Sequence, residues 1–160
     1  MIFNLFKQKE SNNPLLLSKL YDESTFYNQF INDLDKVKKE VIIESPYITS
    51  GRMKMLRPIF KKLINHGVKI FIFTRDPKEQ EENMEIQSEE EISYFEVLGV
   101  QVLLCKGNHH RKLAILDRKI LWEGSLNILS QSHSREIMRR IDDQTLATQM
   151  FNYLKFEKFI

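Results

Sequence analysis

The sequence predicts an α/β domain in which a mixed β-sheet is flanked by helices. Apolar, β-prone runs alternate along the chain with segments whose apolar residues recur every three or four positions. Three closely spaced strand candidates follow this alternation, and an amphipathic helix closes the chain. This order of elements favours an α/β sandwich built on one mixed sheet.

Each helix is predicted from its stripe of apolar residues and from the residues at its ends. Ser24 can cap a helix that extends to Val37, and Gly67 can stop a helix over 52–66 that contains Pro58. Ser88 and Gly99 bound a third helix, and 142–159 form the last one. The strands are expected at 41–48, 68–74, 100–105, 110–117 and 119–125, with a short one at 136–141.

Length and composition indicate one domain. A chain of 160 residues that is 42% hydrophobic can build one core and is too short for two ordinary domains. We therefore treat 1–160 as a single domain in which 1–18 can form a flexible N-terminal segment. No apolar run approaches the roughly 20 residues that span a bilayer, and the N-terminus lacks a signal-peptide core. We expect a soluble, cytoplasmic protein with no stable membrane association.

The net charge of +2 hides a separation of charges along the chain. Residues 45–75 contain seven basic side chains and no acid, whereas 76–96 contain nine acids and one lysine. The two segments either form distinct positive and negative surfaces or are both solvated helix faces. In the first case the stretch from Arg52 to Arg75 could line the approach of a polyanion. Cys105, the only cysteine, is expected in a buried strand and cannot form an intrachain disulfide.

The segment HRKLAILDRKILWEGSLN, residues 110–127, carries the chemical signal. On a strand His110 and Lys112 would share a face, so an imidazole would lie beside a positive charge. If the next strand pairs back, the Ser125 hydroxyl and the Asn127 amide arrive at the same place. Cations and neutral donors in such a group suit a phosphoryl group, because they stabilise the charge on its oxygens.

No cluster of acids with a metal-ligand arrangement accompanies this segment. We therefore expect no metal and no cofactor, and a reaction that survives chelators. The spacing of Cys105, His109 and His133 matches no zinc pattern.

The same residues resemble the HxKx4D motif and the GSxN segment, six residues later, of the phospholipase D superfamily. The stretches VIIESPYIT and VKIFIFTRDP are similar to strands of many members, and residues 121–141 resemble domains appended to some bacterial helicases and restriction systems. Every fixed position of the motif is present at the family's spacing: His110, Lys112, Asp117, Gly124, Ser125 and Asn127.

The resemblance implies a role for each motif residue. His110 would attack phosphorus to form a phosphohistidine, and a histidine from a second motif would protonate the leaving oxygen and then activate water. Lys112 and Asn127 would bind phosphate oxygens, with Ser125 supporting the site. Asp117 would orient and stabilise the site.

A second histidine is required, and this chain has one motif. It therefore resembles the single-motif nucleases, in which two protomers related by a two-fold axis each contribute half of the active site, and a homodimer is expected. The family also places an acid downstream that fixes a histidine tautomer, and Glu136 is the candidate here.

Four further residues are interpreted from their positions. Arg75 ends a strand and Arg111 lies inside the motif, so each is either a substrate contact or a solvated or salt-bridged arginine. On a strand His109 would point away from His110, and we expect it on the surface. Trp122 is expected in the core rather than as a base-stacking platform.

The motif predicts the reaction class better than the substrate. Small size, one motif, no membrane segment and a basic stretch favour a metal-independent endonuclease acting on DNA, or also on RNA. The alternatives are a small phospholipase or phosphatidyl transferase and a non-catalytic nucleic-acid-binding dimer. A helicase or another protein of a defence system is a candidate partner.

Overall fold

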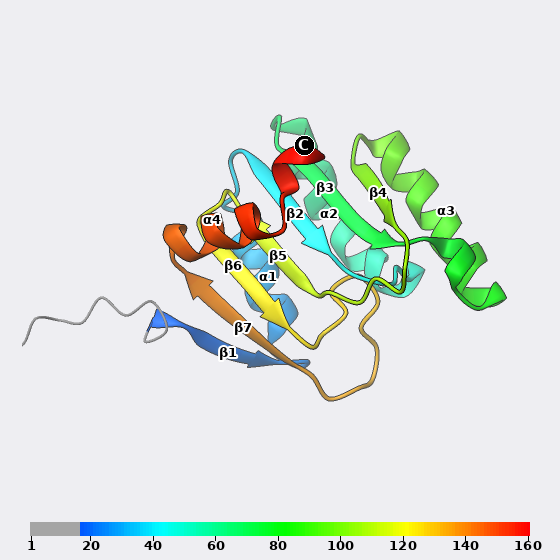
Figure 1. Ribbon diagram of the computed structural model, residues 1–160, viewed down its shortest axis with the longest axis horizontal. Coiled ribbons are helices and arrows are strands. Elements are labelled where there is room, and N and C mark those ends of the chain that lie inside the picture. Colours follow the sequence, from blue (N-terminus) through cyan, green and yellow to red (C-terminus); the bar gives the residue numbers. More distant parts are fainter. Residues whose placement is uncertain (1–16) are drawn as a thin grey trace, which may run out of the picture.

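The computed structural model describes residues 17–160. Within that range the chain forms one mixed sheet with helices on both faces, as predicted (Figure 1). The strand order is β1-β7-β6-β5-β2-β3-β4. The strands are β1 (Lys19–Asp22), β2 (Glu40–Glu44), β3 (Lys69–Arg75), β4 (Gln101–Cys105), β5 (Leu113–Leu116), β6 (Ile120–Gly124) and β7 (Ile137–Asp142). The helices are α1 (Phe26–Leu34), α2 (Ser50–Asn65), α3 (Glu82–Leu98) and α4 (Gln144–Tyr153), with short 3-10 turns η2 (Pro77–Glu79) and η3 (Phe156–Lys158).

Half of the sheet is parallel. β2, β3 and β4 run in the same direction, and α2 and α3 make the crossovers that parallel neighbours need. Helices cover both faces of β2, so three of its five residues are apolar and fully buried. The ends of these three strands therefore lie at one edge of the sheet.

The other half of the sheet is antiparallel. β5 pairs with β2, and Glu44 lies opposite Leu113. A short turn joins β5 to β6, in which Asp117 and Arg118 adopt left-handed φ values of 51° and 53°. β7 and β1 complete this half, and β1 lies in a part of the chain for which no strand was predicted.

Two apolar cores lie on the two faces of the sheet. α1, α2 and α3 pack on one face, and α4 and η3 pack on the other (Figure 1). Trp122 lies in the larger core, as predicted; it is fully buried and stacks edge-on against Phe26. Its indole N–H donates to Asp33, which also accepts from Arg140 at 2.7 Å. The buried Asp33 carboxylate is thus paired, as a charge inside a core must be.

Several boundaries differ from those predicted. α1 begins at Phe26, because Asp22 accepts the backbone N–H groups of Ser24 and Thr25 in a turn that precedes the helix. α3 begins at Glu82, so Ser88 is buried inside the helix and does not cap it. β5 is shorter than predicted, and residues 110–112 form a loop before it. Nearly all of the predicted flexible segment 1–18 lies outside the described residues.

The last two elements also differ from the prediction. The final helix ends at Tyr153 and is followed by a separate 3-10 turn, because Lys155 takes a left-handed φ of 55°. Cys105 lies in a strand as predicted, although it is only half-buried because β4 is an edge strand. Among residues 17–160, no helix has the length and hydropathy to span a membrane.

Gly124 is required by the close approach of β6 to β7. A Cβ atom built at this position would lie 2.1 Å from the carbonyl oxygen of Ile137 and 2.9 Å from the Cα of Met138. Both contacts are to backbone atoms, so rotation of a side chain cannot relieve them. The motif glycine therefore lets the chain cross from β6 into the loop that carries Ser125 and Asn127.

We expect Gly124→Ala to lower the free energy of unfolding by about 2–3 kcal/mol, because overpacking against backbone forces the strands apart. Urea denaturation followed by circular dichroism would measure this loss. Gly51→Ala is the matched control, since apart from its chain neighbours and the backbone of its own helix no described atom lies within 4 Å of a Cβ placed there. Its stability should equal or slightly exceed that of the wild type. Equal stability of the Gly124→Ala variant and the wild type would contradict this account.

Candidate active site

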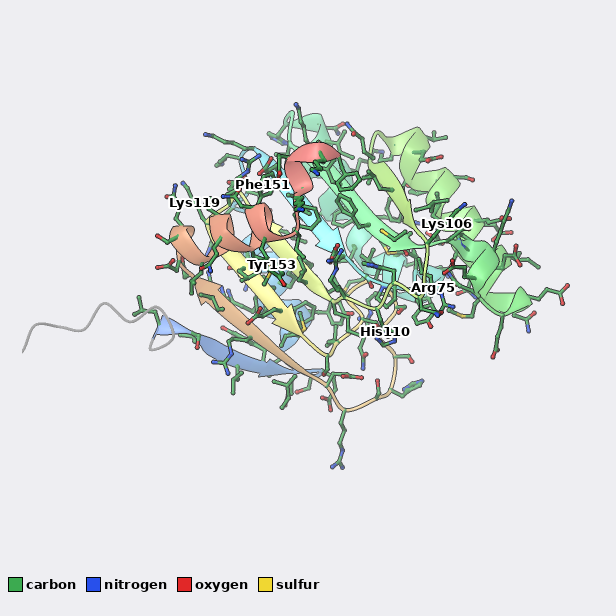
Figure 2. All side chains as sticks on the ribbon, viewed as in Figure 1. Arg75, Lys106, His110, Lys119, Phe151 and Tyr153 are labelled. Atoms are coloured by element: carbon green, nitrogen blue, oxygen red, sulfur yellow. The ribbon has the colours of Figure 1, made fainter. Side chains whose placement is uncertain are left out.

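The motif residues gather at the edge where the parallel strands end. The pairings of Glu44 with Leu113 and of Leu113 with Glu123 place the start of β5 and the end of β6 beside the end of β2. Two loops project from this edge, 106–112 and 125–136. In Figure 2, His110 and Arg75 lie at this end of the sheet, and Lys119 lies at the opposite end.

An open groove of about 970 Å³ lies between these loops and the sheet face that α4 leaves uncovered. It contains six of the eight predicted site residues, all except Asp117 and Arg75, and both charged and apolar side chains surround them. The groove is lined by Leu20, His110, Arg111, Lys112, Leu113, Glu123, Gly124, Ser125, Asn127, Glu136, Ile137 and Arg139.

His110 and Lys112 contact each other at the centre of this groove. The Lys112 Nζ atom lies 2.7 Å from the His110 Nδ1 atom and also donates to the His110 carbonyl oxygen at 2.8 Å. The two residues therefore meet although neither lies on the strand. When Nδ1 carries no proton, it can accept a hydrogen bond from the Lys112 ammonium.

Two effects shift the pKa of Lys112 in opposite directions. Partial burial lowers its pKa, and the negative charge of Glu136 opposes that shift. The Glu136 carboxylate itself accepts a hydrogen bond from the Ser134 hydroxyl at 2.8 Å. The structure therefore brings Glu136 to the groove, where it acts electrostatically on Lys112.

Ser125 and Asn127 lie on the far side of the groove, on the loop after β6. The Ser125 Oγ accepts the backbone N–H of Ile137 at 3.1 Å, which joins the start of this loop to β7. Its own hydrogen can still be donated to an oxygen of a bound anion. The Asn127 Oδ1 is buried and has no hydrogen-bond partner within residues 17–160.

Asp117 lies at the other end of β5 and does not line the groove. Its carboxylate accepts the backbone N–H groups of Lys38 at 2.8 Å, Lys39 at 2.8 Å and Glu40 at 3.0 Å. Lys38 and Lys39 immediately precede β2, and Glu40 is its first residue. The motif aspartate therefore joins the β5–β6 turn to β2, and any effect on His110 is transmitted through the pairing of β2 with β5.

The two arginines that were candidate substrate contacts are both engaged within the protein. Arg111 lines the groove, and its guanidinium contacts both carboxylate oxygens of Glu44 at 2.7 and 2.8 Å. Glu44 is fully buried, and this burial raises its pKa despite the opposing charge of Arg111. Arg75 lies outside the groove and donates to Asn108 at 2.8 Å and to the Tyr47 hydroxyl at 3.3 Å.

The surface position expected for His109 is wrong. Its side chain is buried, because residues 106–112 form a loop that turns this ring inward instead of a strand that would turn it outward. Burial, together with the positive charge of Arg111, lowers the pKa of His109 to about 4. This histidine is therefore neutral near pH 7 and is unsuited to donate a proton.

The basic stretch does not form a patch at the groove. Its residues are spread along α2 and β3, and Arg57 and Lys62 form ion pairs with Glu91 and Asp35. Within the part of the chain that the structure describes, no group of three or more His, Cys, Asp or Glu side chains is arranged to hold a metal ion. The cations that line the groove are instead Lys112, Arg111 and Arg139.

Two residues of the site region were missed from the sequence. Glu44 could have been found, because an acid inside the apolar run VIIES must find a partner when buried. Glu79 gave no such signal among its acidic neighbours, yet it accepts hydrogen bonds from the loop before His110.

Comparisons with known proteins agree with this geometry. The model of a family described as cardiolipin synthase, PLD-like domain, matches residues 30–157. NucT from Helicobacter pylori aligns with a TM-score of 0.68 and 21% identity, over 86% of this chain and 92% of that chain. Nuc from Salmonella typhimurium, a phospholipase D family member, aligns with a TM-score of 0.69 and 15% identity over the same shares, 86% and 92%.

A larger protein shares the same fold. Phosphatidylserine synthase from Haemophilus influenzae aligns with a TM-score of 0.67 and 18% identity, over 89% of this chain and 38% of that chain. At such identities these structures show a common architecture. No significant match was found among curated proteins.

We expect Asp117→Ala to destabilise the fold by about 2 kcal/mol, because three backbone donors lose a charged acceptor. Thermal denaturation would measure the loss. Below the unfolding transition the His110 ring resonances in NMR spectra should stay close to those of the wild type, since the groove residues are untouched. A large shift of those resonances without destabilisation would contradict this purely architectural role.

Proposed function

The chain belongs to the phospholipase D-like family, and on that premise we propose that it is a metal-independent phosphodiesterase that cleaves nucleic acid. The observation that carries the proposal is the meeting of four side chains in one open groove: His110, Lys112, Ser125 and Asn127. They supply a nucleophile, a cation and neutral donors around a volume that a phosphodiester can enter.

The chemistry follows from what each group can do. A ring nitrogen of His110 attacks phosphorus, and the bond from phosphorus to the leaving oxygen breaks as that oxygen takes a proton. Lys112 and the amide N–H of Asn127 stabilise the charge on the remaining oxygens. Water then attacks the phosphohistidine, gives up its proton to the acid that supplied the first one, and releases His110.

The acid has to be a second histidine, and the chain offers few. His66 closes α2 at the opposite edge of the sheet, and His109 is buried and neutral. His133 is exposed on loop 125–136 and makes no hydrogen bond within residues 17–160 that would aim it into the groove. We therefore propose that His110 of the partner subunit in a two-fold homodimer supplies the proton.

The uncovered sheet face supports such a dimer. α4 crosses one end of that face and leaves β1, β6 and β7 open toward the groove (Figure 1). Leu20 and Ile137 line this region and are 60% and 58% exposed. Exposed aliphatic side chains beside a half-complete site are suited to burial against a second copy.

Two observations favour nucleic acid over lipid. The groove is open and lined by Arg111, Lys112 and Arg139, so an extended polyanion can lie across it. The chain also covers 92% of both Nuc and NucT and only 38% of phosphatidylserine synthase. We propose DNA as the substrate, with RNA as a further one, and delivery by a partner such as a helicase.

We expect the purified protein to cleave labelled single- or double-stranded DNA or RNA in excess EDTA. His110→Ala should reduce that cleavage at least about a thousandfold, because no other group replaces the nucleophile. Gel analysis of the products would measure both. Cleavage that EDTA abolishes would contradict the metal-independent reaction.

Lipid-turnover and nucleic-acid-binding measurements beside the cleavage assay distinguish the alternative functions. The description of the matched family and the fold of phosphatidylserine synthase make a small phospholipase or phosphatidyl transferase the second candidate. Turnover of a fluorescent phospholipid in liposomes without nucleic-acid cleavage would establish it. Nucleic-acid binding that His110→Ala leaves unchanged, with no cleavage by the wild type, would indicate a non-catalytic binding dimer.

The shared site predicts how activity depends on subunit mixing. Wild-type and His110→Ala chains are unfolded together and refolded in equal amounts. If each site needs two copies of His110, about one quarter of the wild-type activity should remain, because only one dimer in about four has both. About three quarters would remain if one His110 in a shared site sufficed, and about one half if each chain were active by itself. His133→Ala should keep full activity, and an inactive variant would instead identify His133 as the acid.

A further inference from the structure

A carboxylate outside the groove holds the loop that carries His110. Glu79, on η2, accepts the backbone N–H of Gly107 at 3.0 Å with one oxygen and that of Asn108 at 3.2 Å with the other. Both donors have left-handed φ values, 82° and 58°. Two consecutive left-handed residues turn their N–H groups to the same side, which is why one carboxylate can bind both.

Arg75 completes this arrangement from the end of β3. Its guanidinium donates to the Asn108 side-chain oxygen at 2.8 Å, and its Nε lies 3.5 Å from Glu79. A third contact joins it to the Tyr47 hydroxyl. Only 17% of the Arg75 side chain is exposed, so it is largely buried beside these partners. The loop is thereby tied both through its backbone and through the Asn108 side chain.

The anchored residues immediately precede the site. Asn108 is two residues before His110, and the Arg111 ion pair with Glu44 holds the other side of the loop. Neither Arg75 nor Glu79 lines the groove that contains His110; both line a separate depression beside Tyr47. They are therefore placed to act on the orientation of His110 without touching a phosphate bound beside it.

We propose that Glu79, supported by Arg75, is a positioning residue that fixes the direction in which His110 enters the groove. This inference rests on the proposed function and names the device that orients its nucleophile. Small displacements of a reacting group reduce the rate of the chemical step strongly while leaving substrate binding largely intact. The expected signature is a change in kcat with little change in KM.

The same contacts could also form a phosphate-binding site. Two backbone N–H groups and a guanidinium also suit a phosphate, and Glu79 could occupy a site meant for the flanking backbone of a nucleic acid. The positioning role is favoured because Arg75 is already committed to three partners within the chain. Removal of the carboxylate should lower kcat if Glu79 positions His110, and it should lower KM if Glu79 occupies a phosphate site.

The first arm of the experiment is kinetic and uses the full chain with DNA or RNA. Glu79→Gln replaces one accepting oxygen by an amide that cannot accept, and Arg75→Lys keeps the charge while losing the planar fork. Each should lower kcat about tenfold or more, with KM within about twofold. Glu82→Gln is the matched control: it removes the same charge from an exposed position nearby and should behave as the wild type.

The second arm needs no activity and uses NMR. The hydrogen bonds from Gly107 and Asn108 lower the pKa of Glu79, so these two amide resonances should titrate together below the usual range of a glutamate. A lowered carboxyl pKa means that the anchor is complete above that range and is lost as the pH falls through it. Glu79→Gln should also move the His110 ring resonances, and Glu82→Gln should not.

The outcomes separate this inference from the proposed function. An unchanged kcat in Glu79→Gln, or His110 resonances that do not move, would overturn it. A lower KM in that variant, with Arg75→Lys active, would overturn it in favour of a phosphate site that Glu79 occupies. An inactive wild type whose His110 resonances do respond to Glu79→Gln would refute the nuclease and keep the positioning role.

Discussion

The pairing of β5 with β2 is the contact on which the rest of the site depends. It places the antiparallel half of the sheet against the parallel half, so that Leu113 lies opposite Glu44. The pair is held at both ends by charge: Asp117 accepts three backbone N–H groups at the start of β2, and Arg111 contacts the buried Glu44 at its end. A slip of one residue in this pairing would turn the side chains of β5 to the opposite face of the sheet.

Because of this pairing, some motif residues support the backbone and others project from loops into the groove. Asp117 and Gly124 act on the backbone, the first by accepting N–H groups and the second by leaving room for β7. Their spacing from His110 is set by the length of β5 and of the turn after it. The residues that we propose to react lie just outside the strands, where loops can present side chains that a rigid sheet supports.

Two basic residues of loop 106–112 are opposed by acidic residues from other parts of the chain. The positive charges of Arg111 and Lys112 lie close together in one loop, and Glu44 in the sheet and Glu136 in the second loop oppose them. Glu79 stabilises the backbone before these two residues. Among the described residues the buried Asn127 side-chain oxygen has no hydrogen-bond partner.

The sequence by itself determined the alternation of helices and strands, the motif and the family, because apolar periodicity and fixed spacing are local properties. It also placed Trp122 in the core. Only the tertiary structure decided that His109 is buried, that Ser88 lies inside α3 and that Asp117 is far from the groove. Only folding, likewise, brought Glu44 and Glu79 to the loop before β5. These contacts join residues some thirty to eighty positions apart, and local patterns cannot specify which distant partner a charged side chain will meet.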